Sequence, residues 1–363
     1  MSLDSPTLNA YNDNLSKKVN GFESKIRKFY SDNLEIHPSP PEAFRLRAEF
    51  RVFHDETGAH YAMTDSITKR PYIIKEFRIA GPKIQNLMPV LLSAINGDLV
   101  LRKQLFGIEF LTTLSGEALI TLLYHKKLDQ NWEQSASEVQ DTIDAMIIGR
   151  SKKQKITLKS DFVTEEVTLG ARKLFYRQVE TGFTQPNGQV NIKMLSWALQ
   201  QTKGSQADLL EIYCGNGNFT LALADNFEKI LAVEISKLSI KTAQHNACVN
   251  GIKNTSFIRM SSQELTQAID GIRPFRRLKN INLNEFNFST VLVDPPRSGL
   301  DPTTISLILR YKKIIYFSCN PLTLVQNLIG ILPTHKISAV AVFDQFPWTD
   351  HLEVGLVLEA QRN

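Results

Sequence analysis

The sequence contains little cysteine, and its three cysteines are scattered. Cys214, Cys248 and Cys319 form no CxxC pair, so neither a disulfide framework nor a zinc or iron–sulfur site is indicated. This use of cysteine fits a reducing compartment, and we expect a cytoplasmic protein. No run reaches the roughly 18 uninterrupted apolar residues that a membrane span needs, and the polar first residues do not resemble a signal peptide.

The sequence also lacks a large net charge of either sign. It has 42 basic and 37 acidic residues, and the formal net charge is +5. Such an excess permits nucleic-acid binding but does not require it. The basic residues gather in short clusters, each of which is explained on its own by a solvated surface. Together they favour a basic groove. The clusters are Arg45–Arg51, His125–Lys127, Arg150–Lys155 and Arg276–Lys279.

No internal repeat or low-complexity segment is present, and 363 residues suggest two domains. Residues 8–30 predict one amphipathic helix, which a proline-rich break at 37–41 separates from the rest. A hairpin pattern at 108–124, with helices near 84–96 and 133–146, then indicates an α+β domain with an antiparallel sheet. The expected parts are an N-terminal helix and linker (1–40), the α+β domain (41–180) and a last domain (181–363).

In the last domain, apolar strand-like runs alternate with helical patterns, which is typical of a parallel sheet with helices on both faces. The runs are Asp208–Cys214, Lys229–Ile235, Thr255–Met260, Ser289–Val293 and Lys313–Phe317. Two further runs, 336–343 and 352–358, are too close together for a helical crossover, so this final pair should be antiparallel. Seven strands in this arrangement predict an α/β protein with the Rossmann-like methyltransferase version of the doubly wound fold.

A glycine turn follows the first of these strands. It reads Gly215-Asn216-Gly217-Asn218 and lacks the third glycine of a dinucleotide fingerprint, which favours a smaller adenosine ligand. Glu234 lies 19 residues after Gly215 at the end of the next strand, where an acidic residue binds ribose hydroxyls. The alternative is an ordinary strand-to-helix turn. Asp294, followed by two prolines, ends the fourth strand at the same carboxyl edge, where ligands bind in open α/β sheets.

Cys319 follows the fifth strand. Asn320 is suited to the helix N-cap and Pro321 to the first helical position, so the helix-end potential should lower the pKa of the thiol and favour thiolate. An inert buried cysteine is the alternative, and we keep that interpretation for Cys214 and Cys248.

A methyltransferase needs a thiolate when its acceptor is C5 of uracil. Addition of the thiolate to C6 makes C5 nucleophilic, and a base must then remove the C5 proton.

Glu353 is the candidate for that base. It lies in an otherwise apolar strand, where burial would raise the pKa of the carboxyl group towards a useful range. A solvent-facing position in an alternating strand is the alternative explanation. Asp350 and His351 compete with Glu353 for the role.

With these motifs the sequence resembles the tRNA (uracil-5-)-methyltransferase family, the RNA m5U methyltransferases of the tRNA T-loop type. The resemblance runs through most of the chain, and the combination of motifs is highly specific. The segments that carry it are Phe183–Asn187, Leu210–Asn218, Val293–Gly299, Ser318–Pro321 and His351–Glu353, with Phe44–Arg51 and Leu122–Leu128 in the N-terminal half.

The resemblance implies a role for each matching residue. Cys319 would be the nucleophile and Glu353 the proton acceptor. The residues that would bind S-adenosylmethionine are Gln185, Tyr213, Asn218, Glu234 and Asp294. The cofactor-binding role of Gln185 rests on the resemblance alone, because composition and spacing place this residue in a linker. No metal or iron–sulfur cluster is implied.

The resemblance also implies the reaction and the partner. The product would be 5-methyluridine (ribothymidine) in the T-loop of tRNA, formed through covalent addition to C6, methyl transfer to C5 and elimination. The α+β domain would act as an RNA-recognition domain that holds the T-arm through the basic clusters, with aromatic side chains such as Phe106 stacking on bases. The target uridine would be extruded into the pocket. We expect a monomer that binds no membrane.

Three alternatives are weaker. A ribosomal RNA uridine C5-methyltransferase of this type typically carries an iron–sulfur cysteine cluster and an additional RNA-binding domain, and this sequence has neither. An amino-group methyltransferase of the Asp-Pro-Pro-aromatic type would have an aromatic residue where Arg297 stands, and would not need Cys319. An RNA-binding tRNA-folding factor would not need intact catalytic residues, although a folding role in addition to catalysis is compatible with them.

Overall fold

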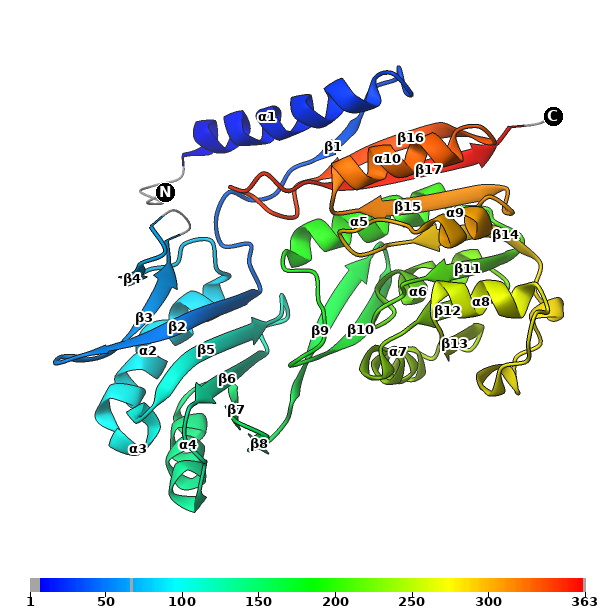
Figure 1. The fold of residues 1–363 in the computed structure, drawn as a ribbon. Coiled ribbons are helices and arrows are strands. Elements are labelled where there is room, and N and C mark those ends of the chain that lie inside the picture. The colour runs from blue at the N-terminus through cyan, green and yellow to red at the C-terminus, as the bar shows by residue number, and fades with distance from the viewer. Residues whose placement is uncertain (1–6, 66–67, 362–363) are drawn as a thin grey trace. The chain divides into compact units, whose positions relative to one another are not determined.

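The computed structural model describes residues 7–65 and 68–361, which form two compact units. Unit 1 contains the described residues of Met1–Ser39, Val167–Tyr176 and Gln189–Asn363. Unit 2 contains those of Pro40–Glu166 and Arg177–Gly188. Figure 1 labels the elements of both units. None of the helices in the described ranges is long and apolar enough to cross a membrane.

Unit 1 is built on a sheet with the strand order β1-β16-β17-β15-β14-β11-β12-β13 (Figure 1). Strand β17 is antiparallel to both of its neighbours, and the other neighbouring pairs are parallel. This confirms the predicted fold class and its final antiparallel pair. The strands are β1 (Glu35–His37), β11 (Asp208–Ile212), β12 (Ile230–Glu234), β13 (Thr255–Arg259), β14 (Phe288–Val293), β15 (Lys313–Ser318), β16 (His335–Phe343) and β17 (Glu353–Ala360). Only the short edge strand β1 was not predicted.

Helices cover both faces of this sheet, which explains why its strands are apolar without alternation. On one face Leu210 and Val291 share a core with α1 (Leu8–Ile26), α8 (Ser262–Ile269), α9 (Pro302–Ile308) and α10 (Pro321–Ile331). On the other face Leu209 and Leu292 share a core with α5 (Gly188–Gln201), α6 (Asn218–Leu223) and α7 (Lys237–Val249). Short 3-10 turns lie at Ala224–Asn226, Arg276–Leu278 and Leu283–Glu285.

Helix α1 is amphipathic, as predicted, although it ends at Ile26 rather than near residue 30. The Thr7 side chain caps it by accepting a hydrogen bond from the Ala10 backbone N–H at 3.2 Å. Its buried residues recur at helical spacing and form one stripe. They are Tyr11, Leu15, Lys18, Val19, Phe22 and Ile26. One of them, Lys18, is charged.

Unit 2 is an α+β unit, as predicted, with the strand order β4-β3-β2-β5-β6-β7-β8. The strands are β2 (Arg47–Asp55), β3 (Gly58–Thr64), β4 (Pro71–Ile73), β5 (Leu105–Thr112), β6 (Ala118–Tyr124), β7 (Met146–Ser151) and β8 (Gln154–Thr157). The helices are α2 (Pro82–Gly97), α3 (Leu99–Arg102) and α4 (Gln130–Thr142). Strands β9 (Phe162–Leu169) and β10 (Arg172–Val179) form a separate two-stranded sheet.

The sheet of this unit, which we expected to be antiparallel, departs from that pattern at one junction. Strands β6 and β7 pair in parallel, with Leu119 opposite Met146. The chain between them contains α4. This helical crossover returns the chain to the end of the sheet at which β6 begins, so β7 runs in the same direction as β6. The predicted helix near 133–146 therefore exists as α4, but it connects parallel strands.

Candidate active site

The edge of the unit 1 sheet brings three of the predicted residues together. Asp294 follows β14 and Cys319 follows the neighbouring strand β15. Strand β17 runs in the opposite direction, so its first residue, Glu353, lies at the same edge. Ser318 pairs with Val354 across the β15–β17 ladder, which sets Cys319 beside Glu353. A thiol and two carboxyl groups thus meet, although they are far apart in the sequence.

Cys319 does not have the lowered pKa that its position at a helix N-terminus predicts. Asn320 does cap α10, because its Oδ1 accepts a hydrogen bond from the Leu322 backbone N–H at 3.1 Å. Burial, and after it the charges of Glu353 and Asp294, nevertheless raise the pKa of the Cys319 thiol to about 11. Arg297 acts in the opposite direction. The expectation fails because desolvation and two carboxylates outweigh the end of one helix.

Glu353 is buried, with 2% of its surface exposed, so it is not the solvent-facing residue of an alternating strand. Burial, and secondly the charge of Asp294, raise the pKa of Glu353 well above its usual range, as expected. Burial also raises the pKa of Asp294 to about 7. In the described part of the chain, Glu353 Oε1 has no hydrogen-bond partner. Such an oxygen is available to a substrate or a water molecule.

The two competing residues have different surroundings. Asp350 is exposed. His351 Nε2 lies 3.3 Å from an Arg297 guanidinium nitrogen, and burial followed by the charge of Arg297 lowers the pKa of His351. The Arg297 carbonyl in turn accepts a hydrogen bond from the Asn320 amide at 3.0 Å. Arg297 and His351 therefore border the Cys319 corner, a role that sequence reasoning missed.

The glycine turn between β11 and α6 has the conformation that its sequence requires. Gly215 and Gly217 have φ values of +56° and +86°, in the left-handed region that favours glycine. A Cβ atom on Gly217 would lie 2.5 Å from Leu221 Cδ1, so a side chain there would force Leu221 to move. Tyr213 also has a positive φ, of +68°. Glu234 reaches this turn, because its carboxylate accepts hydrogen bonds from the backbone N–H groups of Gly215 at 3.2 Å and Ser236 at 2.7 Å.

The remaining predicted residues divide between the two units. Asn218 opens α6, and its side-chain amide pairs with that of Asn191 on α5 through two hydrogen bonds of 2.9 and 3.0 Å. Gln185 is half-buried and belongs to unit 2. The sheet edge of unit 1 therefore brings together Tyr213, Asn218, Glu234, Asp294, Cys319 and Glu353, and Gln185 lies outside that unit.

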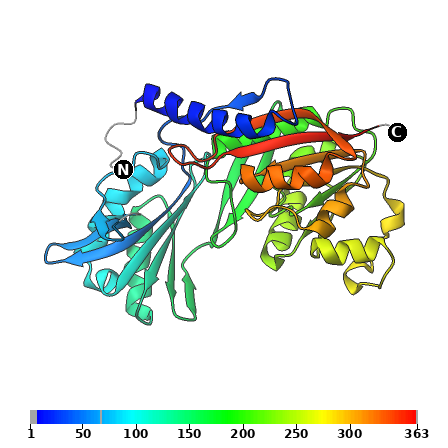
Figure 2. The same ribbon diagram turned by 45° about the horizontal axis from the view of Figure 1, so that its top comes forward.

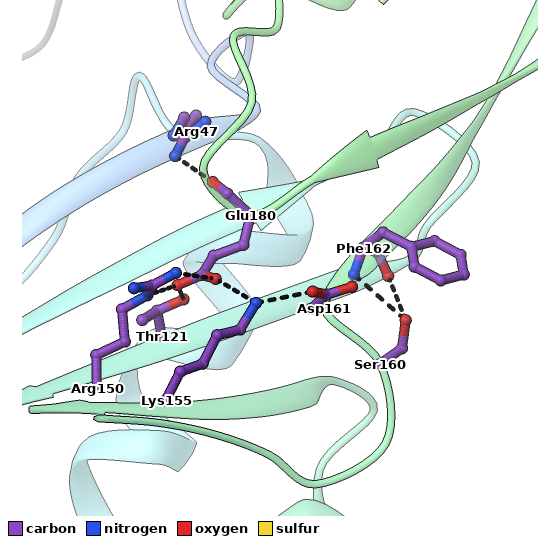
Figure 3. A network of polar contacts seen from close by, with 8 residues as sticks. All are labelled: Arg47, Thr121, Arg150, Lys155, Ser160, Asp161, Phe162 and Glu180. Carbon is purple, nitrogen blue, oxygen red and sulfur yellow. Dashed lines mark hydrogen bonds and ion pairs between the residues drawn. The ribbon is translucent and has the colours of Figure 1, made fainter. Parts of the chain in front are cut away.

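The segment that carries Gln185 is anchored within unit 2 by the buried residue Glu180 (Figure 3). The Glu180 carboxylate accepts hydrogen bonds from Arg150, at 2.9 Å from Nη2, and forms an ion pair with Lys155 at 3.1 Å. Arg47 donates to the backbone carbonyls of Glu180 at 2.6 Å and Gly182 at 2.8 Å. A buried carboxylate needs such partners, and they hold the start of this segment to the sheet.

Glu211 on β11 is a further acidic residue that sequence reasoning missed. It is 1% exposed, and its Oε2 has no hydrogen-bond partner among the described residues. Burial raises the pKa of Glu211 to about 8, with a contribution from Asp294, although Thr220 acts against it. The signal was present in the sequence, because Glu211 stands in an apolar strand just as Glu353 does.

These surroundings fit a cationic ligand with an adenosine group. Buried carboxyl groups with unpartnered oxygens favour a positive charge, and Asp294 lies close enough to affect the pKa values of both Glu211 and Glu353. Glu234 beside the glycine turn suits ribose hydroxyls. Within residues 7–65 and 68–361, no group of three or more His, Cys, Asp or Glu side chains is arranged to hold a metal ion.

Comparisons with known proteins agree with this arrangement. A family model described as tRNA (Uracil-5-)-methyltransferase matches residues 10–361. The chain is 47% identical to the tRNA/tmRNA (uracil-C(5))-methyltransferase of Proteus mirabilis (strain HI4320) over 354 residues, which cover 96% of this chain and 97% of the relative. It is 49% identical to the protein of the same name from Saccharophagus degradans over 350 residues, or 96% of each chain.

A solved structure has a similar fold. It is the tRNA (uracil-54, C5)-methyltransferase of Pyrococcus abyssi in complex with S-adenosyl-L-homocysteine, with a TM-score of 0.72 and 19% sequence identity. The match covers 96% of this chain and 83% of that one. At this level of identity the similarity supports the fold class.

Proposed function

This chain belongs to the tRNA (uracil-5-)-methyltransferase family, and we propose that it methylates C5 of a uridine in the T-loop of tRNA, with S-adenosylmethionine as cofactor. One observation carries the proposal. Cys319 and Glu353 are neighbours at the end of the β15–β17 ladder, next to its last pair, Ser318 and Val354, and at the edge where Asp294 follows β14. A nucleophile next to a buried base is what addition to C6 and proton removal from C5 require.

Cys319 is the proposed nucleophile. Its thiolate forms a bond to C6 of uracil, and the electron pair of the C5–C6 double bond moves into the ring as an enolate, which makes C5 nucleophilic. The Cys319 thiol has a pKa of about 11 in this structure, so thiolate is scarce at neutral pH. Arg297 is the side chain whose charge lowers that pKa. S-adenosylmethionine, when bound, supplies the methyl group that C5 accepts.

Glu353 is the proposed proton acceptor. Once C5 carries the methyl group, the Glu353 carboxylate takes the C5 proton, the C5–C6 double bond forms again, and the C6–Sγ bond breaks to release the thiolate. Its raised pKa suits this step, because a more basic carboxylate takes a carbon-bound proton more readily. The residues proposed to hold the cofactor are Gln185, Tyr213, Asn218, Glu234 and Asp294.

Unit 2 is proposed to bind the T-arm. It contains a cavity of about 910 Å³ near α3 and the start of β5. The Phe106 ring stacks on His125 there, with centroids 3.9 Å apart and planes inclined at 15°. Asp129 is the one acidic residue among the described residues that line the cavity, whereas the basic ones are His54, Arg102, Lys103, His125, Lys126 and Lys127. Basic groups beside an exposed stacking pair suit RNA phosphates and unstacked bases.

We propose that the substrates include tmRNA as well as tRNA. The two bacterial relatives carry tmRNA as well as tRNA in their names. The proposed active form is a monomer, since the nucleophile, the base and their neighbours come from one chain.

Trapping of the covalent intermediate tests the proposed reaction. The protein is incubated with S-adenosylmethionine and a T-arm hairpin that carries 5-fluorouridine at the target position. Fluorine cannot leave as a proton does, so a covalent complex should accumulate and persist on a denaturing gel. Cys319→Ala should abolish the complex, whereas Cys248→Ala, which changes an exposed cysteine, should leave it unchanged.

The second variant in this test is Glu353→Gln with an ordinary uridine substrate. Because elimination requires loss of the C5 proton, this variant should accumulate the covalent complex without fluorine. Methylation of bulk tRNA by Cys319→Ala, or the absence of any complex from the native chain, would show that the acceptor atom or the nucleophile is wrong. A ribosomal RNA fragment in the same assay tests the alternative substrate.

A further inference from the structure

Lys18 is a charged residue in the middle of the buried stripe of α1. Its side chain is 4% exposed, and its ion-pair partner, the Asp344 carboxylate, is fully buried. A charge at such a position is unfavourable unless several acceptors surround it. Packing of α1 against the sheet does not require it, because apolar neighbours such as Leu15, Val19 and Phe22 provide that contact.

The acceptors of Lys18 all lie in the loop between β16 and β17. The Lys18 ammonium pairs with the Asp344 carboxylate and donates to the backbone carbonyls of Phe346 at 3.1 Å and His351 at 3.2 Å. These three residues span the loop from its first position to nearly its last. Figures 1 and 2 both show α1 alongside the β16–β17 hairpin.

A second contact joins the same helix to the same loop. The Tyr11 and Trp348 rings meet edge to face, with centroids 5.8 Å apart. Trp348 has a φ of +65°, which a bulky residue adopts only when its surroundings hold it. The N-terminal helix therefore restrains both the ends and the tip of this loop.

The loop leads directly to the proposed active site. Its carbonyl at His351 lies two residues before Glu353, and the His351 ring contacts Arg297. The Arg297 carbonyl accepts the hydrogen bond from Asn320, the neighbour of Cys319. A continuous chain of contacts thus runs from Lys18 to both proposed catalytic groups.

We propose that Lys18 is a positioning residue, which holds the β16–β17 loop so that the Glu353 carboxylate faces C5 of the bound uracil. The proposal rests on the proton-acceptor role of Glu353. Lys18 itself touches neither RNA nor cofactor in this account. Its loss should therefore affect the elimination step more than the methyl transfer that precedes it.

The experiment separates this role from a contribution to stability. Lys18→Met or Asp344→Leu alone leaves a buried charge without its partner, so each single variant should melt at a lower temperature. The double variant Lys18→Met/Asp344→Leu removes both charges and should recover much of that loss. The control is Lys17→Met, which changes an exposed lysine on the same helix.

The readout is the course of successive turnovers on a T-arm hairpin with ordinary uridine. In the double variant, the first turnover should keep its native rate and later turnovers should slow about tenfold, because a misplaced base delays product release. The covalent complex should accumulate on a denaturing gel. Lys17→Met should behave as the native chain, and Glu353→Gln should show the same pattern as the double variant more strongly.

Two results would overturn the proposal, and they differ. If the double variant is stable and shows neither slow later turnovers nor a covalent complex, Lys18 has only a structural role. If Glu353→Gln, in which Lys18 is intact, accumulates no complex, then Glu353 is not the proton acceptor, and the inference about Lys18 fails with it.

Discussion

At the residue scale, the environment of Cys319 controls the reactivity of the nucleophile. Its thiol has a pKa of about 11 because it is half-buried beside Glu353 and Asp294, while Arg297 acts against them. A thiol with a raised pKa is mostly protonated at neutral pH, so it reacts slowly with oxidants and with stray electrophiles, which react with thiolate. The same surroundings mean that any change of neighbouring charge alters the thiolate fraction.

Charge-changing variants of these neighbours should alter the alkylation rate of Cys319 in opposite directions. At pH 9 Asp294, with a pKa of about 7, is ionised, so Asp294→Asn removes a negative charge and should speed alkylation by iodoacetamide. Arg297→Gln should slow it. A half-unit change in the thiol pKa alters the thiolate fraction about threefold. Mass spectrometry of the Cys319 peptide gives the rate, and the exposed Cys248 is the internal reference. Equal rates in both variants would contradict the described surroundings of the thiol.

At the element scale, the turn between β11 and α6 depends on glycine at two positions for different reasons. Gly217 has a positive φ and also lies against Leu221, where a Cβ atom would approach to 2.5 Å. Gly215 has a positive φ, but a Cβ atom there would have no neighbour within 4 Å. Gly217 is therefore restricted by both its backbone conformation and the space around it, and Gly215 by its backbone conformation alone.

Alanine substitutions should therefore have unequal effects on stability. Gly215→Ala should lower the free energy of unfolding by about 1 kcal/mol, from left-handed strain. Gly217→Ala should lower it by about 2 to 4 kcal/mol, because steric overlap adds to that strain. Urea unfolding of the two variants measures the difference. Equal losses would mean that the Leu221 side chain moves aside without a penalty.

At the scale of the whole molecule, buried carboxyl groups make stability depend on pH. Burial raises the pKa of Glu211 to about 8 and the pKa values of Asp294 and Glu165 to about 7. Such groups are protonated in the folded chain at pH values where the unfolded chain has lost those protons. Stability should therefore rise as the pH falls from 8 to 6.5. Near pH 6.5 and below, His37 and His351 oppose the trend, since burial lowers their pKa values and the unfolded chain then binds more protons at these positions.

Urea midpoints at pH 6.5 and pH 8 test this dependence. One proton taken up on folding changes the free energy of unfolding by about 1.4 kcal/mol per pH unit. Glu211→Gln should reduce the difference between the two midpoints, whereas Glu228→Gln, at an exposed position, should not. A native chain that is less stable at pH 6.5 than at pH 8 would contradict the prediction.

Much of the fold could be predicted because its signals are local. The apolar runs of unit 1 gave the strands β11 to β17, and the short connection after β16 predicted the antiparallel end of the sheet. The parallel β6–β7 pair could not be predicted in this way. Which edge a strand joins depends on the path of the chain through α4 and on contacts with residues distant in sequence.

The candidate site shows the same division between the sequence and the tertiary structure. The sequence by itself determined that Asp294 and Cys319 follow parallel strands at the same edge of the sheet, because alternation of strands and helices sends the carboxyl ends of those strands to one edge, and it placed Glu353 in an apolar strand. Only the tertiary structure decided the direction of the Cys319 pKa shift, the presence of Glu211 beside Asp294, and the contact of Lys18 with the β16–β17 loop. The physical reason is that burial and electrostatic interactions depend on distance in space, and these partners are separated in the chain by tens to hundreds of residues.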